Sequence, residues 1–527
     1  MANFTGPIIT DALMYLGRDL NRRECQHSDT AILNRALAKY RMDFALVCAF
    51  AASTQGVDYG NELLFKELAG QKQLLPCPAV LPNSCEETGA EHKFIAGLIE
   101  RGARFACFFL ATSGTSLDRR ITGRLMEAMQ KKRLPLALFG APMPEVAGLA
   151  EEFPDLPIML HAPKTRDRIF WPLFRRTKNL HVSLAANFSP YHGLEILAGY
   201  QASDRILFAS GFPIAEPGAA LAGLLYADLK ESDLRKIASG NIERLMAGVK
   251  TASARPRAPA PPAHKTPPRG MAACIWRRAP LPLKGAVDMH AHYGKWREFP
   301  VWGGFADDLL RAMDRVGMEK IIVAHHACMS PEVVWGNDQV LAAIRKYPGR
   351  IAGYATCYPV EKKLGAQENI RCIKGGMTGI KLHNSNWIPY TDPRYRPVWE
   401  FADRLRLPVL LHTWGDLPNY EEVFRKYRRA QILLGHSGAG NPEVYVKFAR
   451  KYPQLYLELV YSVSPYGLVE YFTREVGSCR ILYGSDAPWL SMGHQIGRIV
   501  FADISEADKK RILVDNPRRI LNAIRRP

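Results

Sequence analysis

Residues 286–292 read AVDMHAH, a short apolar run with two histidines, His290 and His292, at its end. Seven similar runs follow in the second half of the chain, and amphipathic stretches such as GFADDLLRAMDRVG (304–317) lie between them. These runs are KIIVAHH (320–326), RIAGYATC (350–357), TGIKLH (378–383), PVLLH (408–412), QILLGH (431–436), LYLELVYS (455–462) and RILYGSD (480–486). Strands that alternate with helices predict a parallel α/β sheet.

Eight such strands suffice to close a (β/α)8 barrel of the TIM type. An open, doubly wound sheet is the alternative. No G-x-G-x-x-G turn follows a strand to open a helix, which argues against the dinucleotide-binding form of that alternative.

The first half of the chain repeats the second. RILFASGFPI (205–214) matches RILYGSDAPW (480–489), and LRKIASGNIERLM (234–246) matches KKRILVDNPRRIL (509–521). The offset between paired positions stays between 273 and 277 residues over the whole domain. A constant register of this kind indicates a tandem duplication of one complete fold.

A linker separates the two halves. Residues 251–284 contain eight prolines and seven basic residues with no acidic residue, a composition typical of an extended spacer. We therefore expect a first barrel over 1–250, a Pro/Arg-rich linker over 251–284 and a second barrel over 285–527. Each flank has the ~250 residues of an ordinary (β/α)8 barrel.

Composition sets further limits. The chain has 527 residues, 47% of them hydrophobic and 23% charged, which is an ordinary globular mixture too long for one core. The net charge of +19 comes with no recognition-helix or aromatic RNA-binding signature, so we expect a basic surface and no specific nucleic acid partner. Ten scattered cysteines, no apparent signal peptide and no long apolar run favour a cytoplasmic protein that does not enter a membrane.

Six residues that can bind metal fall at the carboxyl ends of the expected strands, where barrel enzymes carry their active sites. Taken singly, each has an ordinary explanation, such as a buried core histidine or a helix-capping aspartate. Together on one rim they predict a site for Zn²⁺, with Mn²⁺, Fe²⁺ or Ni²⁺ as alternatives. The six are His290, His292, Lys381, His412, His436 and Asp486.

The motifs VDMHAHYG, GIKLH, PVLLHTWG, ILLGHSG and RILYGSDAPW, with the ending VDNPRRILNA, resemble the amidohydrolase superfamily. The similarity is to its amidohydrolase-related branch, which contains hydrolases and non-oxidative decarboxylases. The resemblance implies that His290, His292, His412 and Asp486 are metal ligands. It implies that His436 either binds a second ion or contacts the bound water and substrate.

In two-metal members of the superfamily a carboxylated lysine bridges the ions, and Lys381 stands at that position. A plain lysine that pairs with Asp486 is the equal alternative, so the site has one ion or two.

The first half lacks these ligands. Only His161, opposite His436, keeps its type, and one histidine does not hold a catalytic cation. We expect a degenerate barrel that forms an internal pseudo-dimer with the second, with further oligomerisation left open. The other positions carry Leu13 opposite His290, Tyr15 opposite His292, Cys107 opposite Lys381, Phe139 opposite His412 and Gly211 opposite Asp486.

Residues shared by both halves are expected to be structural. Gly336-Asn337 recurs as Gly60-Asn61, so this pair is predicted to support the backbone rather than catalysis. Five further residues near the rim are candidates for a substrate pocket, although packing is the commoner role for such side chains. They are His325, His326, His383, Trp414 and Trp489.

The first functional expectation is hydrolysis of an amide, lactone or ester of a small molecule by metal-activated water, with Asp486 as general base and His436 at the oxyanion. The second is decarboxylation of an aromatic or enol carboxylate on the same scaffold. The third is a binding protein without catalysis. The H-x-H motif and Lys381 favour the first over the second.

Overall fold

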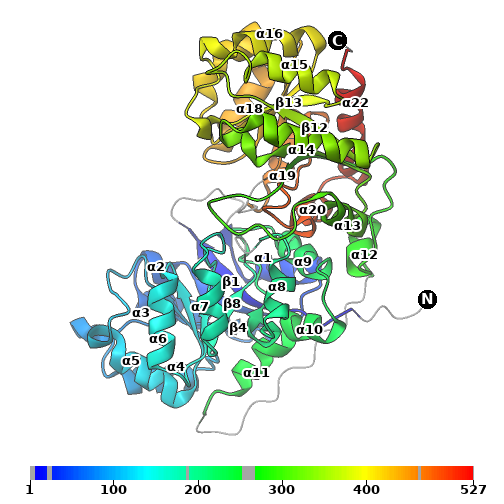
Figure 1. The fold of residues 1–527 in the computed structure, drawn as a ribbon. Helices are drawn as coiled ribbons and strands as arrows, with labels where there is room; N and C mark the ends of the chain where they lie inside the picture. Colours follow the sequence, from blue (N-terminus) through cyan, green and yellow to red (C-terminus); the bar gives the residue numbers. More distant parts are fainter. Residues whose placement is uncertain (1–5, 20–26, 186–188, 252–266, 461–464, 526–527) are drawn as a thin grey trace. The chain divides into compact units, whose positions relative to one another are not determined.

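The chain divides into two compact units (Figure 1): unit 1 is Met1–Pro267 and unit 2 is Pro268–Pro527. The computed structural model describes residues 6–19, 27–185, 189–251, 267–460 and 465–525. No helix among these residues is long and apolar enough to cross a membrane.

Unit 2 contains one sheet of eight strands in sequential order, and every neighbouring pair is parallel. Its edges meet where Met289 N–H donates to Tyr483 O at 3.0 Å and Asp486 N–H donates to His290 O at 2.8 Å. The expected barrel is therefore confirmed for the second half of the chain. The strands are β10 (Val287–Tyr293), β11 (Lys320–His325), β12 (Ile351–Thr356), β13 (Gly379–Leu382), β14 (Pro408–His412), β15 (Gln431–Gly435), β16 (Leu455–Glu458) and β17 (Ile481–Leu482).

Helices follow the strands of unit 2 because each intervening stretch has one apolar face to bury against the barrel. The barrel interior is filled by apolar side chains from alternate strand positions, including Met289, Ile322, Leu410 and Leu433. The helices are α13 (Ala306–Val316), α14 (Val333–Lys346), α15 (Ala366–Lys374), α16 (Arg396–Leu405), α17 (Glu421–Lys426), α18 (Pro442–Lys451), α19 (Leu468–Val476), α20 (Met492–Val500), α21 (Glu506–Lys510) and α22 (Asn516–Asn522).

Residues 252–266 of the linker expected over 251–284 lie outside the described residues. Its later part differs from the expectation, because helix α12 (Gly270–Trp276) lies within it. Met271, Ile275 and Trp276 are buried, and Met271 N–H donates to Glu506 of unit 2. Apolar side chains that can be buried thus make this stretch part of a folded unit.

Unit 1 has two sheets, one of four strands in the order β2-β1-β3-β4 and one of five in the order β5-β6-β7-β8-β9. Isolated parallel bridges pair Ala79 with Cys107 and Met14 with Phe212. A second complete barrel stays a prediction. The strands are β1 (Thr10–Arg18), β2 (His27–Ser28), β3 (Phe44–Ala49), β4 (Leu74–Pro76), β5 (Ala106–Phe109), β6 (Leu136–Phe139), β7 (Ile158–Leu160), β8 (Leu180–Ser183) and β9 (Ile206–Leu207).

The helices of unit 1 alternate with these strands, as in unit 2. The last helices of the two units have the same form, since a π-helical segment joins α10 to α11 at Lys236–Gly240 and α21 to α22 at Arg511–Asp515. The helices of unit 1 are α1 (Thr30–Tyr40), α2 (Ala51–Thr54), α3 (Val57–Glu67), α4 (Glu91–Glu100), α5 (Arg119–Lys132), α6 (Met143–Glu152), α7 (Phe170–Arg176), α8 (Gly193–Gly199), α9 (Pro217–Leu225), α10 (Glu231–Arg235) and α11 (Asn241–Ala247).

The asparagine shared by both units supports the backbone, as predicted. Asn61 donates to Ala79 O and accepts from Ala79 N–H, at 2.8 and 2.7 Å. Asn337 makes the same pair of bonds to Thr356, at 3.0 and 3.0 Å. Both side chains are buried, so each satisfies a strand-end peptide group that water does not reach.

Candidate metal centre

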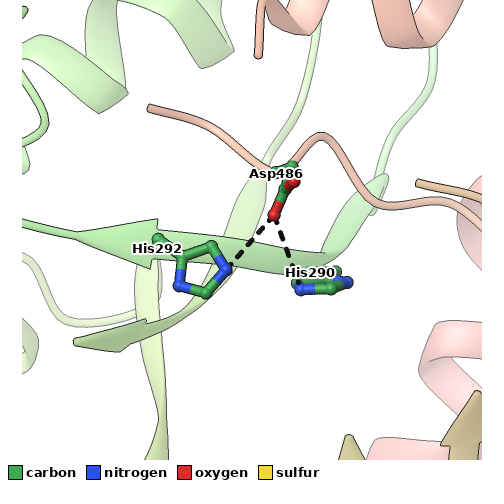
Figure 2. Close-up of side chains that lie close together, drawn as sticks. All are labelled: His290, His292 and Asp486. Atoms are coloured by element: carbon green, nitrogen blue, oxygen red, sulfur yellow. Dashed lines mark ion pairs between the residues drawn. The ribbon is translucent and has the colours of Figure 1, made fainter. Parts of the chain in front are cut away.

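Two histidines and one aspartate meet at the carboxyl end of the barrel of unit 2 (Figure 2). His290 and His292 lie on β10, and Asp486 lies in the segment that follows β17. The Asp486 Oδ1 atom is 3.2 Å from His292 Nε2 and 3.6 Å from His290 Nε2. The two imidazoles point to the same carboxylate because alternate residues of a strand face the same side.

These three residues form a group that can hold a metal ion. Their ligand atoms all lie within 4.8 Å of one another, and they are the only such group of histidines, cysteines and carboxylates among the described residues. All three side chains are almost completely buried. The donor set of two imidazole nitrogens and a carboxylate oxygen suits a divalent transition metal ion.

The electrostatics keep the ligand atoms in the forms that bind metal. Burial would raise the pKa of Asp486, but the hydrogen bond from His292 and the other neighbouring histidine rings hold it well below its usual value. Burial lowers the pKa of His292, and burial together with the charge of Lys381 lowers that of His290. An ionised carboxylate beside neutral imidazoles is the state required for coordination.

The backbone brings Asp486 to this place at a cost. Its φ is +59°, a left-handed conformation that residues other than glycine adopt rarely. Ser485 and Asp486 both donate their N–H groups to His290 O, at 3.1 and 2.8 Å. These bonds tie the end of the eighth strand to the first strand, so the carboxylate and the histidines belong to one rigid frame.

His412 and His436 lie beside the group without belonging to it. The ring of His436 is 5.3 Å from that of His290 and 4.6 Å from that of His412, measured between centroids. His412 stacks on His383 at 4.1 Å, and its buried Nδ1 has no hydrogen-bond partner. Both histidines are thus near the three-residue group, and their roles as ligand and catalytic residue stay predictions.

Lys381, on β13, is completely buried, and its Nζ atom lies 3.1 Å from His290 Nε2. Burial lowers the pKa of its ammonium group. The expected position of this lysine beside the ligands is therefore found, while its carboxylation stays a prediction.

Glu458 is the residue that sequence reasoning missed. It lies at the end of β16 and is fully buried, and its Oε2 accepts a hydrogen bond from His290 Nδ1 at 2.7 Å. A signal was available, because Glu458 is the one charged residue in the apolar run LYLELVYS. A charge in a buried strand needs a partner, which marks it as a candidate for the site.

Aromatic side chains surround the ligands. Trp489 stacks on His292 at 4.6 Å and on His326 at 5.1 Å, and Phe299 meets Trp489 edge to face at 5.1 Å. His325 has a local structural contact instead, since its Nδ1 accepts from Ala327 N–H.

The remaining pocket candidates lie near His412. Trp414 stacks at 6.1 Å from the His412 ring, and half of its surface is exposed. Together with the stacking of His383 on His412, this places four of the five candidates beside the metal-binding group or His412.

Unit 1 has a different set of side chains at the corresponding strand ends. His161 Nε2 lies 3.3 Å from Tyr15 Oη, and His161 Nδ1 lies 3.1 Å from Ser183 Oγ. Phe139 packs against His161 at 4.7 Å, and Leu13 and Phe139 are both buried in an apolar cluster. In the part of unit 1 that the structure describes, no group of ligands meets the spacing found in unit 2.

This chain was compared with protein families and with known proteins. A family model described as Amidohydrolase matches residues 86–246 and 287–523, more than half of the chain and parts of both units. The gamma-resorcylate decarboxylase of Polaromonas sp. strain JS666 is 25% identical over 274 residues, which are 39% of this chain and 84% of that protein. The gamma-resorcylate decarboxylase of Rhizobium sp. strain MTP-10005 is 22% identical over 281 residues, 41% of this chain and 86% of that protein.

One similar solved structure is the dihydroxybenzoic acid decarboxylase from Polaromonas sp. JS666 with bound manganese and 2-nitroresorcinol. The match covers 46% of this chain and 97% of that protein, with 20% sequence identity and a TM-score of 0.36. The extent of the family match decides the assignment. The chain belongs to the amidohydrolase family.

Proposed function

We propose that unit 2 is a metal-dependent, non-oxidative decarboxylase of an aromatic carboxylate. The observation that carries this proposal is the match to gamma-resorcylate decarboxylases over 84% and 86% of their lengths. The cluster of His290, His292 and Asp486 supports it, because that group supplies the ligands that such chemistry needs. The decarboxylase thereby takes precedence over the hydrolase that the sequence alone ranks first.

The ion would be held by His290, His292 and Asp486, with His412 as a further ligand. The buried His412 Nδ1 has no hydrogen-bond partner, and a bound cation would give this side chain one. A bound divalent cation would supply positive charge for the carboxylate and a neighbouring hydroxyl oxygen of the substrate. Zn²⁺ is the first expectation from the ligand types, and Mn²⁺, Fe²⁺ and Ni²⁺ suit them too.

The protein's own residues would move the proton. Decarboxylation adds one proton at the ring carbon that carries the carboxylate, and the carbon–carbon bond breaks to release CO₂ and return its electron pair to the ring. The candidate donor is an acid close to His436 and Asp486, and His436 itself is the first choice because its ring lies beside His290 at the strand ends. Trp489, which stacks on His292, and Trp414, which lies beside His412, are the candidate apolar surfaces for an aromatic substrate.

Hydrolysis of an amide, lactone or ester is the second candidate. The contact between Lys381 Nζ and His290 Nε2 favours it, because a lysine at this position fits a two-ion hydrolytic site. In that reaction Asp486 would serve as general base and His436 would stabilise the oxyanion. The number of ions separates the two candidates, because a bridged pair requires the carboxylated lysine.

We also propose that the chain arose by duplication of one barrel and that unit 1 (1–250 as expected from sequence) no longer binds metal. The family model matches parts of both units, and Asn61 and Asn337 make the same backbone bonds. An internal pseudo-dimer of the two barrels, joined by the linker expected at 251–284, is the arrangement we expect.

The test is an assay of the whole chain with gamma-resorcylate after loading with Mn²⁺ or Zn²⁺. We expect CO₂ release that depends on the ion and is lost in Asp486→Asn. Cleavage of lactones, esters or amides without CO₂ release would favour the hydrolase. A protein that binds no metal and turns over none of these compounds would be a binding protein, which would overturn the proposal.

A further inference from the structure

Glu458 and His290 form a buried pair in which every polar atom of the carboxylate has a partner. Glu458 Oε2 accepts from His290 Nδ1 at 2.7 Å, and Oε1 accepts from Val460 N–H at 2.8 Å. Both side chains have no exposed surface. A buried acid is costly unless it is bonded in this way, so its presence here needs a reason.

The neighbours of His290 select one tautomer of its imidazole. At Nδ1 it faces the Glu458 carboxylate, which accepts a hydrogen, and at Nε2 it faces the Lys381 ammonium, which donates one. These partners favour the hydrogen on Nδ1, so the Nε2 lone pair accepts from Lys381 and can pass to a metal ion that displaces this contact. That lone pair is on the side of Asp486, whose Oδ1 lies 3.6 Å away.

Gly484 makes the space in which this pair fits. A Cβ atom at Gly484 would lie 2.2 Å from Glu458 Oε1 and 2.5 Å from His290 Cβ. Distances this short are not tolerated, so any larger residue would displace the carboxylate or the imidazole. The backbone of Gly484 does not have a positive φ, and the need for glycine at this position is therefore one of space alone.

The three positions differ together in unit 1. Within the 273–277-residue offset of the repeat, Ser183 stands for Glu458 and Ala209 for Gly484, and Leu13 stands for His290. Ser183 lies against His161 Nδ1 at 3.1 Å instead. The acid and the space for it occur in the unit that has the histidine and are missing from the unit that has leucine.

We infer that Glu458 is a positioning residue of the metal centre: its carboxylate fixes the His290 ring and tautomer, and Gly484 provides the room for this contact. The inference rests on the metal-binding part of the proposed function and extends it to two residues outside the ligand set. Partners of this kind orient metal-binding histidines and raise their basicity, and their loss typically lowers metal affinity ~10–100-fold.

The conservative variant Glu458→Gln separates this role from simple packing. Glutamine keeps the size, but its single carbonyl oxygen cannot accept both the His290 and the Val460 hydrogens. In one orientation its NH₂ opposes Val460 N–H, and in the other it donates to His290 Nδ1 and favours the tautomer that cannot bind metal through Nε2. We therefore expect glutamine to fail where a purely steric role would accept it.

The experiment measures the Kd of the whole chain for Mn²⁺ and for Zn²⁺, by titration in competition with a chelating dye. We expect Glu458→Gln and Gly484→Ala each to raise the Kd by ~10–100-fold, with apoprotein that stays folded by circular dichroism. Glu368→Gln is the control for loss of a buried carboxylate, since Glu368 is buried on α15 and bonds Asn337. Gly353→Ala is the control for crowding, because its Cβ would lie 2.7 Å from Val340 in the same barrel.

A Kd within about twofold of wild type for folded Glu458→Gln would overturn the inference, as would equal losses in the two controls. The outcome is independent of the substrate. If the wild type binds metal but releases no CO₂ from gamma-resorcylate, the proposed reaction fails while the Kd values still decide the role of Glu458.

Discussion

In unit 1 the Asp11 carboxylate accepts the N–H groups of Leu13 and Ser210, and in unit 2 Asp288 accepts those of His290 and Ser485. All four distances are 3.0 or 3.1 Å, and both aspartates are fully buried. The same clamp thus joins the first and last strands of each unit. The side chain held by this clamp differs, because the residue whose N–H is bonded is Leu13 in unit 1 and His290 in unit 2.

The segment after the last strand gives the same contrast. Gly211 and Asp486 both have a left-handed backbone, with φ of +70° and +59°. Glycine adopts this conformation without steric cost, whereas aspartate does so at a cost. Unit 1 uses the residue that suits the turn, and unit 2 keeps the carboxylate that suits an ion. The two units thus have the same backbone arrangement at this place, and only unit 2 has the side chains that can bind a metal ion.

The largest effect is expected for Asp486→Asn. It removes the charge of the carboxylate but keeps its shape, so activity should fall ~10³-fold or more with the fold intact. The measurement is CO₂ release from gamma-resorcylate together with circular dichroism. Activity near that of wild type would show that catalysis does not need the Asp486 carboxylate, which unit 1 replaces by Gly211.

Next in size is the exchange of one ligand for its counterpart, His290→Leu. Loss of one imidazole should reduce bound metal from stoichiometric to a small fraction, measured by elemental analysis after dialysis. The reverse exchange, Leu13→His with Tyr15→His, should not create a site in unit 1, because Gly211 provides no carboxylate. Metal bound by that double variant in excess of wild type would contradict the comparison.

The third prediction concerns pH. Burial raises the pKa of Asp11 from 3.8 to about 7. The folded state therefore binds this proton more tightly than the unfolded state, so the stabilisation is complete below pH ~4 and is lost as pH rises through ~7. Asp11→Asn does not titrate, and its stability relative to wild type should increase between pH 5 and 8 by about 2–3 kcal/mol.

Urea unfolding of Asp11→Asn and wild type at several pH values measures this change. Asp118→Asn is the control of opposite sign, because hydrogen bonds from Arg120 lower the pKa of Asp118 to about 2. Its stability relative to wild type should change only in acid. If the free energies of unfolding of Asp11→Asn and wild type differ by the same amount from pH 5 to 8, the pKa of Asp11 is not raised in the folded state.

A smaller effect is expected for Asn61→Ala and Asn337→Ala. Each removes at least two hydrogen bonds to a buried backbone segment and should cost about 2–3 kcal/mol of unfolding free energy in its own unit. Asn337 should cost more, since it also donates to Glu368. Thermal unfolding followed with metal content checks the prediction. A cost below about 0.5 kcal/mol in either variant would show that the shared asparagine does not support the frame.

The smallest effect is expected for His161→Asn. This histidine contacts Tyr15 and Ser183, and no described metal-binding group includes it. Metal content and activity should therefore stay within about twofold of wild type. A loss of either in a folded variant would assign unit 1 a part in the site and would end the view that only unit 2 retains the chemistry.

Much of this molecule could be predicted from its sequence. Apolar runs at regular spacing gave the eight strands of unit 2, and the two-residue spacing of His290 and His292 gave their common direction. The ordering of hydrolysis before decarboxylation was less successful. The H-x-H motif and Lys381 describe the ligands of an ion, and the reaction depends on how the substrate lies against groups that no motif records.

The strands, the repeat and the residues able to bind metal can be read from the amino-acid order, because hydrophobic periodicity and side-chain chemistry are local properties of the chain. Which of these residues meet depends on how the strands are arranged in the folded barrel. The barrel brings Glu458 of the seventh strand to His290 of the first, beside the space left by Gly484. Contacts between residues 168 positions apart arise from closure of the sheet, which no local pattern encodes.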